Sequence, residues 1–209
     1  MRTWVKFCGC TSPDDVRAAA DAGADAFGMI FARSPRRIAL QAAEAIARRR
    51  DRLALEAVAV VADPSSGDLD AIRALFPDAW LQFSGNETPE FVSRWGGRVM
   101  KTIHVNPHDD AVALERSCRE FPAARILFDT QFGARPGGSG RTFAWSSIGG
   151  IASQRDVIVA GGLNAENVGA CVAGVRPFGV DVRSGIETAG RKDPAKMRAF
   201  VRAVREAAA

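Results

Sequence analysis

Histidine and cysteine, the residues that most often bind transition metals, are scarce in this chain of 209 residues. Only two histidines occur, His104 and His108, and no Cys-x-x-Cys pair is present, which argues against a zinc site. The four cysteines, at positions 8, 10, 118 and 171, are too scattered for a disulfide scaffold and favour a reducing, cytosolic setting. A disulfide between Cys8 and Cys10 would close a very small, strained ring.

Long apolar runs are also lacking. No stretch approaches the ~18 uninterrupted apolar residues of a membrane span, and the opening MRTWVKF has no apolar region typical of a signal peptide. The net charge of +4 does not come from one basic block. The run of arginines at 48, 49, 50 and 52 closes a predicted helix, where cations suit the negative end of the helix dipole. We therefore expect a small anionic substrate, and neither a nucleic acid nor a membrane as partner.

Short apolar runs alternate with Ala-, Arg- and Glu-rich stretches of helical spacing along the whole chain. The runs fall at residues 4–8, 25–31, 55–62, 79–83, 98–104, 124–129, 156–160 and 178–182. Strands that alternate with helices predict parallel pairing through right-handed crossovers. Eight such units use the whole chain, and eight strands close a barrel with a packed interior. The sequence predicts an α/β fold, a single (β/α)8 TIM barrel over residues 1–209; periodicity alone leaves a doubly wound open sheet as the alternative.

Four helix starts are marked by a capping side chain followed by proline, a residue suited to the first helical turn. They are Ser12-Pro13, Thr88-Pro89, Asn106-Pro107 and Asp193-Pro194. Each follows a predicted strand, as a βα loop requires.

Two reactive side chains end predicted strands, where barrels of this kind carry their chemistry. Asp129 ends "RILFDT", and a carboxylate there is costly unless it is paired or functional. Alternation places Asp129 at the mouth if Leu127 faces the interior. Cys8 ends the first strand and shares a face with Lys6, whose ammonium would favour the thiolate. The alternatives are an aspartate that caps the next loop and an inert, buried cysteine.

Three glycine-rich turns predict a phosphate site. "GGSG" (137–140), "AGGLN" (160–164) and "RSGIE" (183–187) supply bare backbone N–H groups. Barrels frequently bind phosphate through the loops after strands seven and eight. Arg36 in "SPRRI" lies in a loop at the same mouth and is able to hold a carboxylate, although Arg37 or ordinary surface charge remain alternatives.

A thiol, a carboxyl, an anion clamp and a phosphate cradle together indicate proton-transfer chemistry. No nicotinamide fingerprint and no Ser/His pairing support other reaction classes. A different phosphosugar barrel, such as an epimerase or lyase, and a non-catalytic barrel that binds a phosphorylated ligand stay open as alternatives.

The order of the motifs resembles the phosphoribosylanthranilate isomerase family of tryptophan biosynthesis. The similar segments are "VKFCGCTSPDDVRAAADAGADAFGMIFARSPRRI", "LFDT" followed by "GGSG", "VIVAGGLNAENV" and "GVDVRSGIETAGRKDPAKMRAF". Together they cover nearly the whole chain. The resemblance implies a (β/α)8 barrel without a cofactor that converts N-(5-phosphoribosyl)anthranilate into a 1-(carboxyphenylamino)-1-deoxyribulose 5-phosphate.

The resemblance also implies roles for individual residues. Cys8 would be the general base and Asp129 the general acid, and Arg36 would hold the anthranilate carboxylate. The predicted substrate-binding set is completed by Asp181, by Gly138 and Gly140 at the mouth, and by Gly161, Gly162, Ser184 and Gly185 at the phosphate. A cytoplasmic monomer or homodimer is expected.

Three positions depart from the family pattern. Ser84 stands where the family usually carries a histidine, which predicts an altered mouth rather than lost activity. Arg183 adds a cation near the predicted phosphate loop, and Cys10 has no inherited role.

Overall fold

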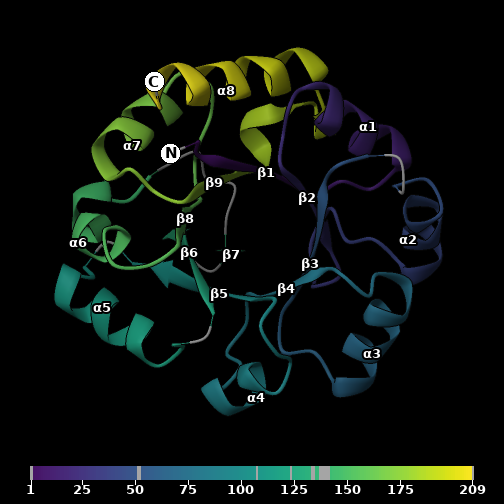
Figure 1. The fold of residues 1–209 in the computed structure, drawn as a ribbon, viewed down its shortest axis with the longest axis horizontal. Helices are drawn as coiled ribbons and strands as arrows, with labels where there is room; N and C mark the ends of the chain where they lie inside the picture. The colour runs from purple at the N-terminus through teal and green to yellow at the C-terminus, as the bar shows by residue number, and fades with distance from the viewer. Residues whose placement is uncertain are drawn as a thin grey trace.

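Eight parallel strands form a closed barrel in the computed structural model, which describes residues 2–50, 53–106, 108–122, 124–132, 135–136 and 142–208 (Figure 1). Neighbouring strands follow the order β5-β4-β3-β2-β1-β9-β8-β6, and pairing of β5 with β6 closes the ring. The predicted barrel is confirmed, and the open-sheet alternative is wrong. The strands are β1 (Trp4–Cys8), β2 (Ala26–Ile30), β3 (Glu56–Val61), β4 (Trp80–Phe83), β5 (Val99–Val105), β6 (Arg125–Phe132), β8 (Val157–Val159) and β9 (Gly179–Val182).

Helices surround the barrel as an outer ring (Figure 1). They are α1 (Pro13–Asp21), α2 (Leu40–Ala47), α3 (Ser66–Leu75), α4 (Pro89–Ser93), α5 (Ala111–Arg119), α6 (Gly149–Ala152), α7 (Val168–Val175) and α8 (Pro194–Ala207), with 3₁₀ turns η2 (Trp145–Ile148) and η3 (Ser184–Ile186). Short strand β7 (Arg135–Pro136) pairs with β6, and β10 (Glu187–Thr188) with β11 (Arg191–Lys192). No described helix is long and apolar enough to cross a bilayer.

Three of the four predicted helix starts are confirmed. Ser12, Thr88 and Asp193 cap α1, α4 and α8 with their side chains. The start predicted at Asn106-Pro107 is wrong: Pro107 lies outside the described residues, and α5 begins four residues later. Its cap is Asp110, whose carboxylate accepts a hydrogen bond from the N–H of Ala113 at 2.8 Å. The Asn106 amide instead donates to Asp109, which closes the loop before the helix.

Strand alternation divides the core into two layers. Cys8, Ile30, Val58 and Leu127 belong to the cluster inside the barrel, whereas Phe128 and its outward-facing counterparts on other strands pack against the helices. Leu127 therefore faces inward, as the placement of Asp129 at the mouth requires. Burial of this kind on both faces explains why the strands read as continuous apolar runs.

The amino-terminal end of the barrel, here called the floor, consists of Trp4, Glu56, Trp80, Arg125 and Phe178. Both indole N–H groups donate to the Glu56 carboxylate, each at 3.0 Å. The Arg125 guanidinium lies 4.1 Å from the Trp80 ring centre and 4.2 Å from that of Phe178. These residues close the barrel at the end opposite the strand carboxyl termini.

Candidate active site

The mouth, formed by the carboxyl ends of the strands and the loops that follow them, contains a buried ion pair next to Cys8. Lys6 on β1 is opposite Asp181 on β9 in the parallel register, and its Nζ donates to Asp181 Oδ2 at 2.9 Å. Lys6 is fully buried. Burial alone would lower the pKa of the Lys6 ammonium, but the charges of Asp181 and of a Cys8 thiolate, with their hydrogen bonds, outweigh burial and raise it.

Cys8 is the last residue of β1 and is buried inside the barrel. Burial raises the pKa of its thiol, and the positive charge of Lys6 acts in the opposite direction without cancelling the effect. The charge of Lys6 thus lowers the pKa of Cys8, as the sequence predicts. Burial has the larger effect, and the Cys8 thiol is harder to deprotonate than an exposed thiol. Cys8 consequently carries its proton at neutral pH before a ligand binds.

Asp129 lies on β6, directly opposite His104 of β5 in the strand register. Its Oδ1 is buried and has no hydrogen-bond partner among the described residues. Burial raises the pKa of the Asp129 carboxyl; a positive charge on His104 lowers this pKa, and the charge of Asp181 raises it further. Asp129 therefore stays protonated at higher pH than an exposed aspartic acid does.

His104 is a mouth residue whose place the sequence reasoning missed, because it considered this histidine only as a metal ligand. Its Nε2 lies 3.0 Å from the carbonyl oxygen of Ser84, and its Nδ1 is buried without a partner in the described part of the chain. Period-two alternation along β5 could have placed His104 inward. The neighbouring position of Asp129 depends on the β5–β6 register, which one sequence does not show.

The position where the family usually has histidine is occupied by a hydroxyl network. Ser84 Oγ lies 2.9 Å from Thr102 Oγ1, and Gln82 Nε2 donates to the same threonine oxygen at 3.2 Å. Gln82 is buried and its Oε1 has no described partner. Polar atoms of β4 and β5 thus face the mouth without an imidazole at position 84.

The loops after β8 and β9 touch each other through their glycines. A methyl group at position 185 would lie 2.0 Å from the carbonyl oxygen of Leu163, and one at position 161 would lie 2.3 Å from Thr130 Oγ1. Gly161 and Gly162 also have positive φ angles, of 85° and 67°, which glycine adopts without strain. Gly161, Gly162 and Gly185 are therefore required by the geometry, and Ser184 lies in η3 beside them. Gly138 and Gly140 lie outside the described residues.

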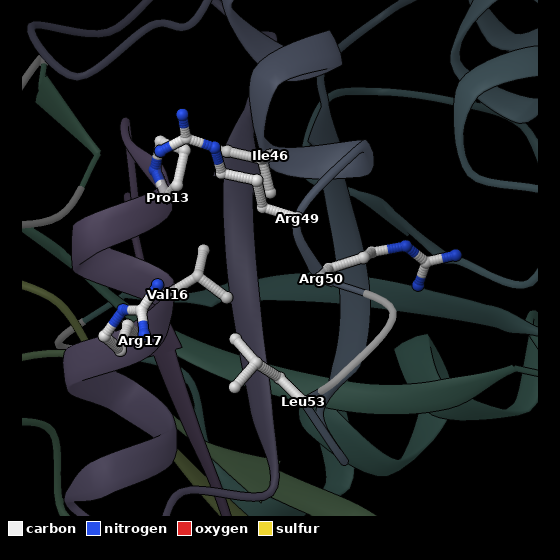
Figure 2. Close-up of a pocket in the computed structure, with 7 residues that line it drawn as sticks. All are labelled: Pro13, Val16, Arg17, Ile46, Arg49, Arg50 and Leu53. Atoms are coloured by element: carbon white, nitrogen blue, oxygen red, sulfur yellow. The ribbon is translucent and has the colours of Figure 1, made fainter.

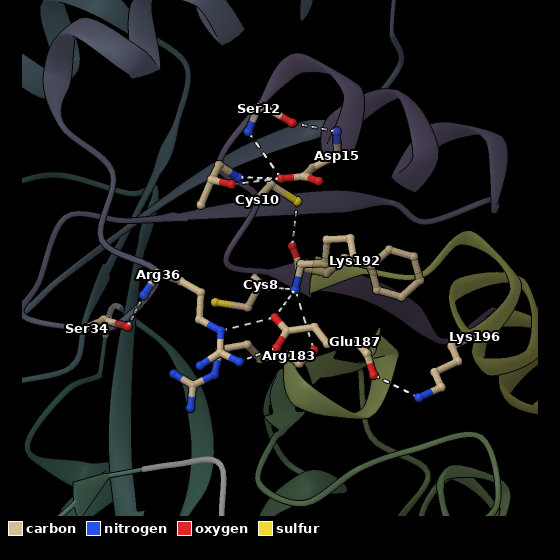
Figure 3. Close-up of polar contacts among 12 residues, drawn as sticks. Cys8, Cys10, Ser12, Asp15, Ser34, Arg36, Arg183, Glu187, Lys192 and Lys196 are labelled. Carbon is tan, nitrogen blue, oxygen red and sulfur yellow. Dashed lines mark hydrogen bonds and ion pairs between the residues drawn. The ribbon is translucent and has the colours of Figure 1, made fainter. Parts of the chain in front are cut away.

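Arg36 forms an ion pair that the sequence did not predict. Its Nε donates to Glu187 Oε1 at 3.3 Å, and its Nη2 bonds the other carboxylate oxygen. Glu187 is buried and is also bonded by Lys192 Nζ at 3.0 Å. The same ammonium donates to the carbonyl oxygen of Cys8 at 2.5 Å, which connects the loop after β9 to the end of β1 (Figure 3).

Cys10 is separated from Cys8 by the direction of its side chain. It is fully buried outside the barrel, among Val16, Phe27 and Met29, and its Sγ donates to the carbonyl oxygen of Phe7 at 3.6 Å. Burial raises the pKa of this thiol to about 12. Cys10 is a core residue between α1 and the sheet and does not face the mouth.

A second hollow lies on the outside of the barrel, between α1 and α2 (Figure 2). It is lined by Pro13, Val16, Arg17, Ile46, Arg49, Arg50 and Leu53. Arg50 is bonded to Asp78 at the surface, and none of the mouth residues contributes to the lining. Within the described ranges, no group of three or more His, Cys, Asp or Glu side chains could hold a metal ion.

A closed barrel of eight parallel strands within a ring of helices belongs to the class of (β/α)8 barrels, and the thiol, the buried carboxyl and the glycine-rich loops lie at the end where such barrels carry their active sites. Residues 5–203 match the family model for N-(5'phosphoribosyl)anthranilate (PRA) isomerase. A relative of that name from Desulforudis audaxviator is 45% identical, covering 98% of this chain and 99% of its own.

Solved structures agree with the sequence match. Phosphoribosyl anthranilate isomerase from Thermotoga maritima superimposes with a TM-score of 0.87 at 29% identity, over 98% of this chain and 99% of that one. A phosphoribosyl anthranilate isomerase in complex with reduced 1-(o-carboxyphenylamino)-1-deoxyribulose 5-phosphate gives a TM-score of 0.83 at 28% identity, again over 98% and 99%. This chain belongs to the N-(5'-phosphoribosyl)anthranilate isomerase family, whose members are intramolecular aldose–ketose isomerases.

Proposed function

We propose that this chain catalyses the Amadori rearrangement of N-(5-phosphoribosyl)anthranilate to 1-(2-carboxyphenylamino)-1-deoxy-D-ribulose 5-phosphate, a step of tryptophan biosynthesis. The observation that carries the proposal is the inward placement of Cys8, the last residue of β1, and of Asp129, on the mouth side of Leu127 in β6, together with the abutting loops after β8 and β9. Family membership over nearly the whole chain supports it. So does the ligand of one matched structure, a reduced carboxyphenylamino deoxyribulose phosphate.

In the first step Asp129 acts as general acid. It donates its proton to the ribose ring oxygen, the C1′–O4′ bond breaks, and the nitrogen lone pair forms a protonated Schiff base at C1′. The raised pKa of Asp129 favours the protonated carboxyl that this step requires. Because Oδ1 has no described partner, a ligand oxygen is able to approach the carboxyl.

In the second step the Cys8 thiolate acts as general base and removes the proton from C2′, which gives an enolamine. The positive Schiff base next to C2′ acidifies that C–H bond and also stabilises the thiolate, which offsets the burial that raises the Cys8 pKa. Tautomerisation then moves the C2′ hydroxyl proton to the Asp129 carboxylate and the thiol proton to C1′. Asp129 is then a carboxylic acid again. Cys8 is a thiolate, and it takes back from water the proton that it released to water when the cationic Schiff base formed, so no net proton is gained or lost.

Binding falls to the residues around this pair. Arg36 holds the anthranilate carboxylate, and the backbone of Gly161, Gly162, Ser184 and Gly185 cradles the phosphate. Asp181 Oδ2 accepts a hydrogen bond from Lys6, and Oδ1 has no partner among the described residues. Oδ1 is therefore available to a sugar hydroxyl. We assign Gly138 and Gly140 to the rim of the mouth on the family resemblance alone.

We further propose a cytoplasmic enzyme that is a monomer or a homodimer. One matched structure carries monomers made from a dimeric phosphoribosylanthranilate isomerase of Thermotoga maritima. Size-exclusion chromatography with light scattering distinguishes the two states for this chain.

The test is incubation of the purified protein with freshly prepared phosphoribosylanthranilate, following the loss of its fluorescence. We expect turnover by the natural chain and a decrease of about 10²- to 10⁴-fold in Cys8→Ser and in Asp129→Asn. Cys10→Ser is the matched control, because its thiol faces the outer core, and it should turn over at close to the natural rate. Absence of reaction in the natural chain would favour the non-catalytic binding barrel.

A further inference from the structure

The hairpin after β9 holds a buried carboxylate, Glu187, that no step of the reaction uses. Strands β10 and β11 place Glu187 directly opposite Lys192, and the two residues that connect them, Ala189 and Gly190, both have positive φ angles. Two such residues form the type I′ turn that fits a two-residue hairpin. The Glu187 side chain is only 4% exposed, so its position is set by the protein and not by solvent.

Two lysines fix Glu187 in place, one through its carboxylate and one through its backbone. Lys192 Nζ donates to Oε1 at 3.0 Å and is itself held by the carbonyl oxygen of Cys8. Lys196 of α8 donates to the Glu187 backbone carbonyl at 2.8 Å. Figure 3 shows Glu187 bonded to Lys192 of the hairpin and to Lys196 of α8, and Lys192 bonded in turn to Cys8 of β1. The carboxylate is therefore a rigid acceptor for any group that approaches from the loop after β2.

Arg36 is the group that approaches from that loop, and Glu187 occupies only one edge of its guanidinium. The two bonds use Nε and one hydrogen of Nη2. A guanidinium has five N–H donors in one plane, so three remain for a ligand. Arg36 is 24% exposed, unlike its partner. Fixing one edge on a buried carboxylate sets the plane and the direction of the edge that faces the mouth.

The local charge balance favours an anionic ligand. Within the described part of the chain, Arg36 and Lys192 share Glu187 as their carboxylate partner and have no other. Arg183 adds a third cation, because a methyl group at position 9 would lie 3.6 Å from the side chains of both Arg183 and Arg36. Three cations against one carboxylate leave a net positive charge, which a ligand carboxylate on the free edge of Arg36 would reduce.

We propose that Glu187 is a positioning residue that orients Arg36 and thereby makes the mouth select ligands with a carboxylate on the aryl amine. The inference rests on the proposed function, in which Arg36 holds the anthranilate carboxylate. It adds that the selectivity depends on a residue that does not touch the ligand. If Glu187 is merely structural, its substitution weakens the binding of all ligands alike. If it is a positioning residue, its substitution weakens the binding of only those ligands that Arg36 recognises.

The experiment compares two ligands by isothermal titration calorimetry, so that binding is measured without turnover. One is reduced 1-(o-carboxyphenylamino)-1-deoxyribulose 5-phosphate, and the other is the same compound without its carboxyl group. The natural chain should prefer the carboxylated ligand. In Glu187→Gln we expect this preference to decrease by about tenfold or more, while the affinity for the ligand without a carboxyl changes by less than about threefold.

Arg36→Ala separates this inference from the proposed function. If Arg36→Ala loses the preference and Glu187→Gln keeps it, the positioning role is overturned and the proposed anchor stands. If Arg36→Ala keeps the preference, the carboxylate anchor lies elsewhere. The assignment of Arg36 as anchor and the positioning role of Glu187 are then both overturned. Equal weakening of the two ligands in Glu187→Gln would show a structural role and would also overturn the inference.

A second variant covers the case in which Glu187→Gln does not fold because Lys192 is left unpaired. Glu187→Gln with Lys192→Met removes the buried pair together, and the same loss of preference is expected. Circular dichroism confirms folding before each titration. Glu115→Gln, which removes a carboxylate paired with Arg119 on the surface of α5, is the matched control and should retain the full preference.

Discussion

At the floor of the barrel, the Glu56 carboxylate accepts hydrogen bonds from Trp4 and Trp80, and Arg125 lies between two aromatic rings. At the mouth, the same strands end in carboxyls, an imidazole and hydroxyls whose partners are incomplete. Among the described residues, buried polar atoms without a partner occur there on Gln82, His104, Asp129, Thr130 and Asp181, whereas of the five floor residues only Arg125 has one, its Nη1.

The difference shows how one barrel serves two purposes. A buried polar atom without a partner costs free energy, about 1–3 kcal/mol in typical cases. The floor reduces this cost through contacts within the protein and so contributes to stability. The mouth retains the cost until a ligand supplies the missing partners, which means that its polar atoms are arranged for binding. Substitutions at the floor and at the unpartnered polar residues of the mouth should therefore separate stability from activity, whereas the buried pair of Lys6 and Asp181 at the mouth also contributes to stability.

The largest expected effect on stability comes from Lys6→Met at the mouth. The change leaves the buried Asp181 without its partner, and breaking such a pair typically costs about 3–5 kcal/mol. Urea denaturation at neutral pH measures the free energy of unfolding. The double variant Lys6→Met with Asp181→Leu removes both charges and should recover most of the loss. A loss below about 1 kcal/mol in the single variant would mean that the pair is not an essential part of the buried structure.

A smaller effect on stability is expected from Glu56→Ala at the floor. The change leaves two indole N–H groups and Arg98 without their common acceptor. Because Glu56 is partly exposed, water replaces some of the bonds, and we expect a loss of about 1–3 kcal/mol. Below its melting temperature the variant should keep kcat/KM within about twofold of the natural chain, because distant sites act independently. A tenfold loss of kcat/KM in the folded variant would contradict the separation of the two ends.

The smallest effect should come from Asp129→Asn, which is expected to stabilise the protein while it abolishes turnover. Burial raises the pKa of Asp129 in the folded chain above its unfolded value of about 3.9. The folded state therefore binds this proton more tightly, and stability is lost as pH rises from the unfolded pKa through the folded one.

Asparagine carries no charge, so the variant should match the natural chain near pH 3 and become the more stable of the two chains above the raised pKa. Thermal melts over this pH range, with Asp70→Asn on the exposed face of α3 as control, measure the difference. Equal pH dependence in the two chains would show that the Asp129 pKa is not raised.

Most of the fold could be predicted from the sequence because buried parallel strands leave continuous apolar runs. Each predicted run overlaps an observed barrel strand. Alternation alone would place Cys8 and Cys10 on one face, and the turn at Gly9, with a φ angle of 77°, is what separates them. The start of α5 could not be predicted from capping residues alone. Asn106, Asp109 and Asp110 are all capable of capping, and the choice among them depends on how the loop closes.

The site was less accessible to sequence reasoning. Cys8, Asp129 and the glycines of the last two loops could be placed because each ends a strand or begins a βα loop. The bond between Arg36 and Glu187 joins residues 151 positions apart, and no local pattern indicates it. His104 and Asp129 likewise become neighbours only through the register of β5 and β6. Pairings between distant segments decide the electrostatics of the mouth, and a single sequence does not reveal them.

The pairing of β1 with both β2 and β9 has a consequence for synthesis of the chain. Cys8 and Arg36 leave the ribosome early, whereas Glu187, Lys192 and β9 emerge last. Until β9 arrives, β1 keeps an open edge with unpaired backbone groups, which is a surface prone to wrong pairing between chains. The mouth is therefore completed only after β9 has been made. A nascent chain cut short before β9 would contain Cys8 but neither Glu187 nor Lys192, which binds the Cys8 carbonyl oxygen.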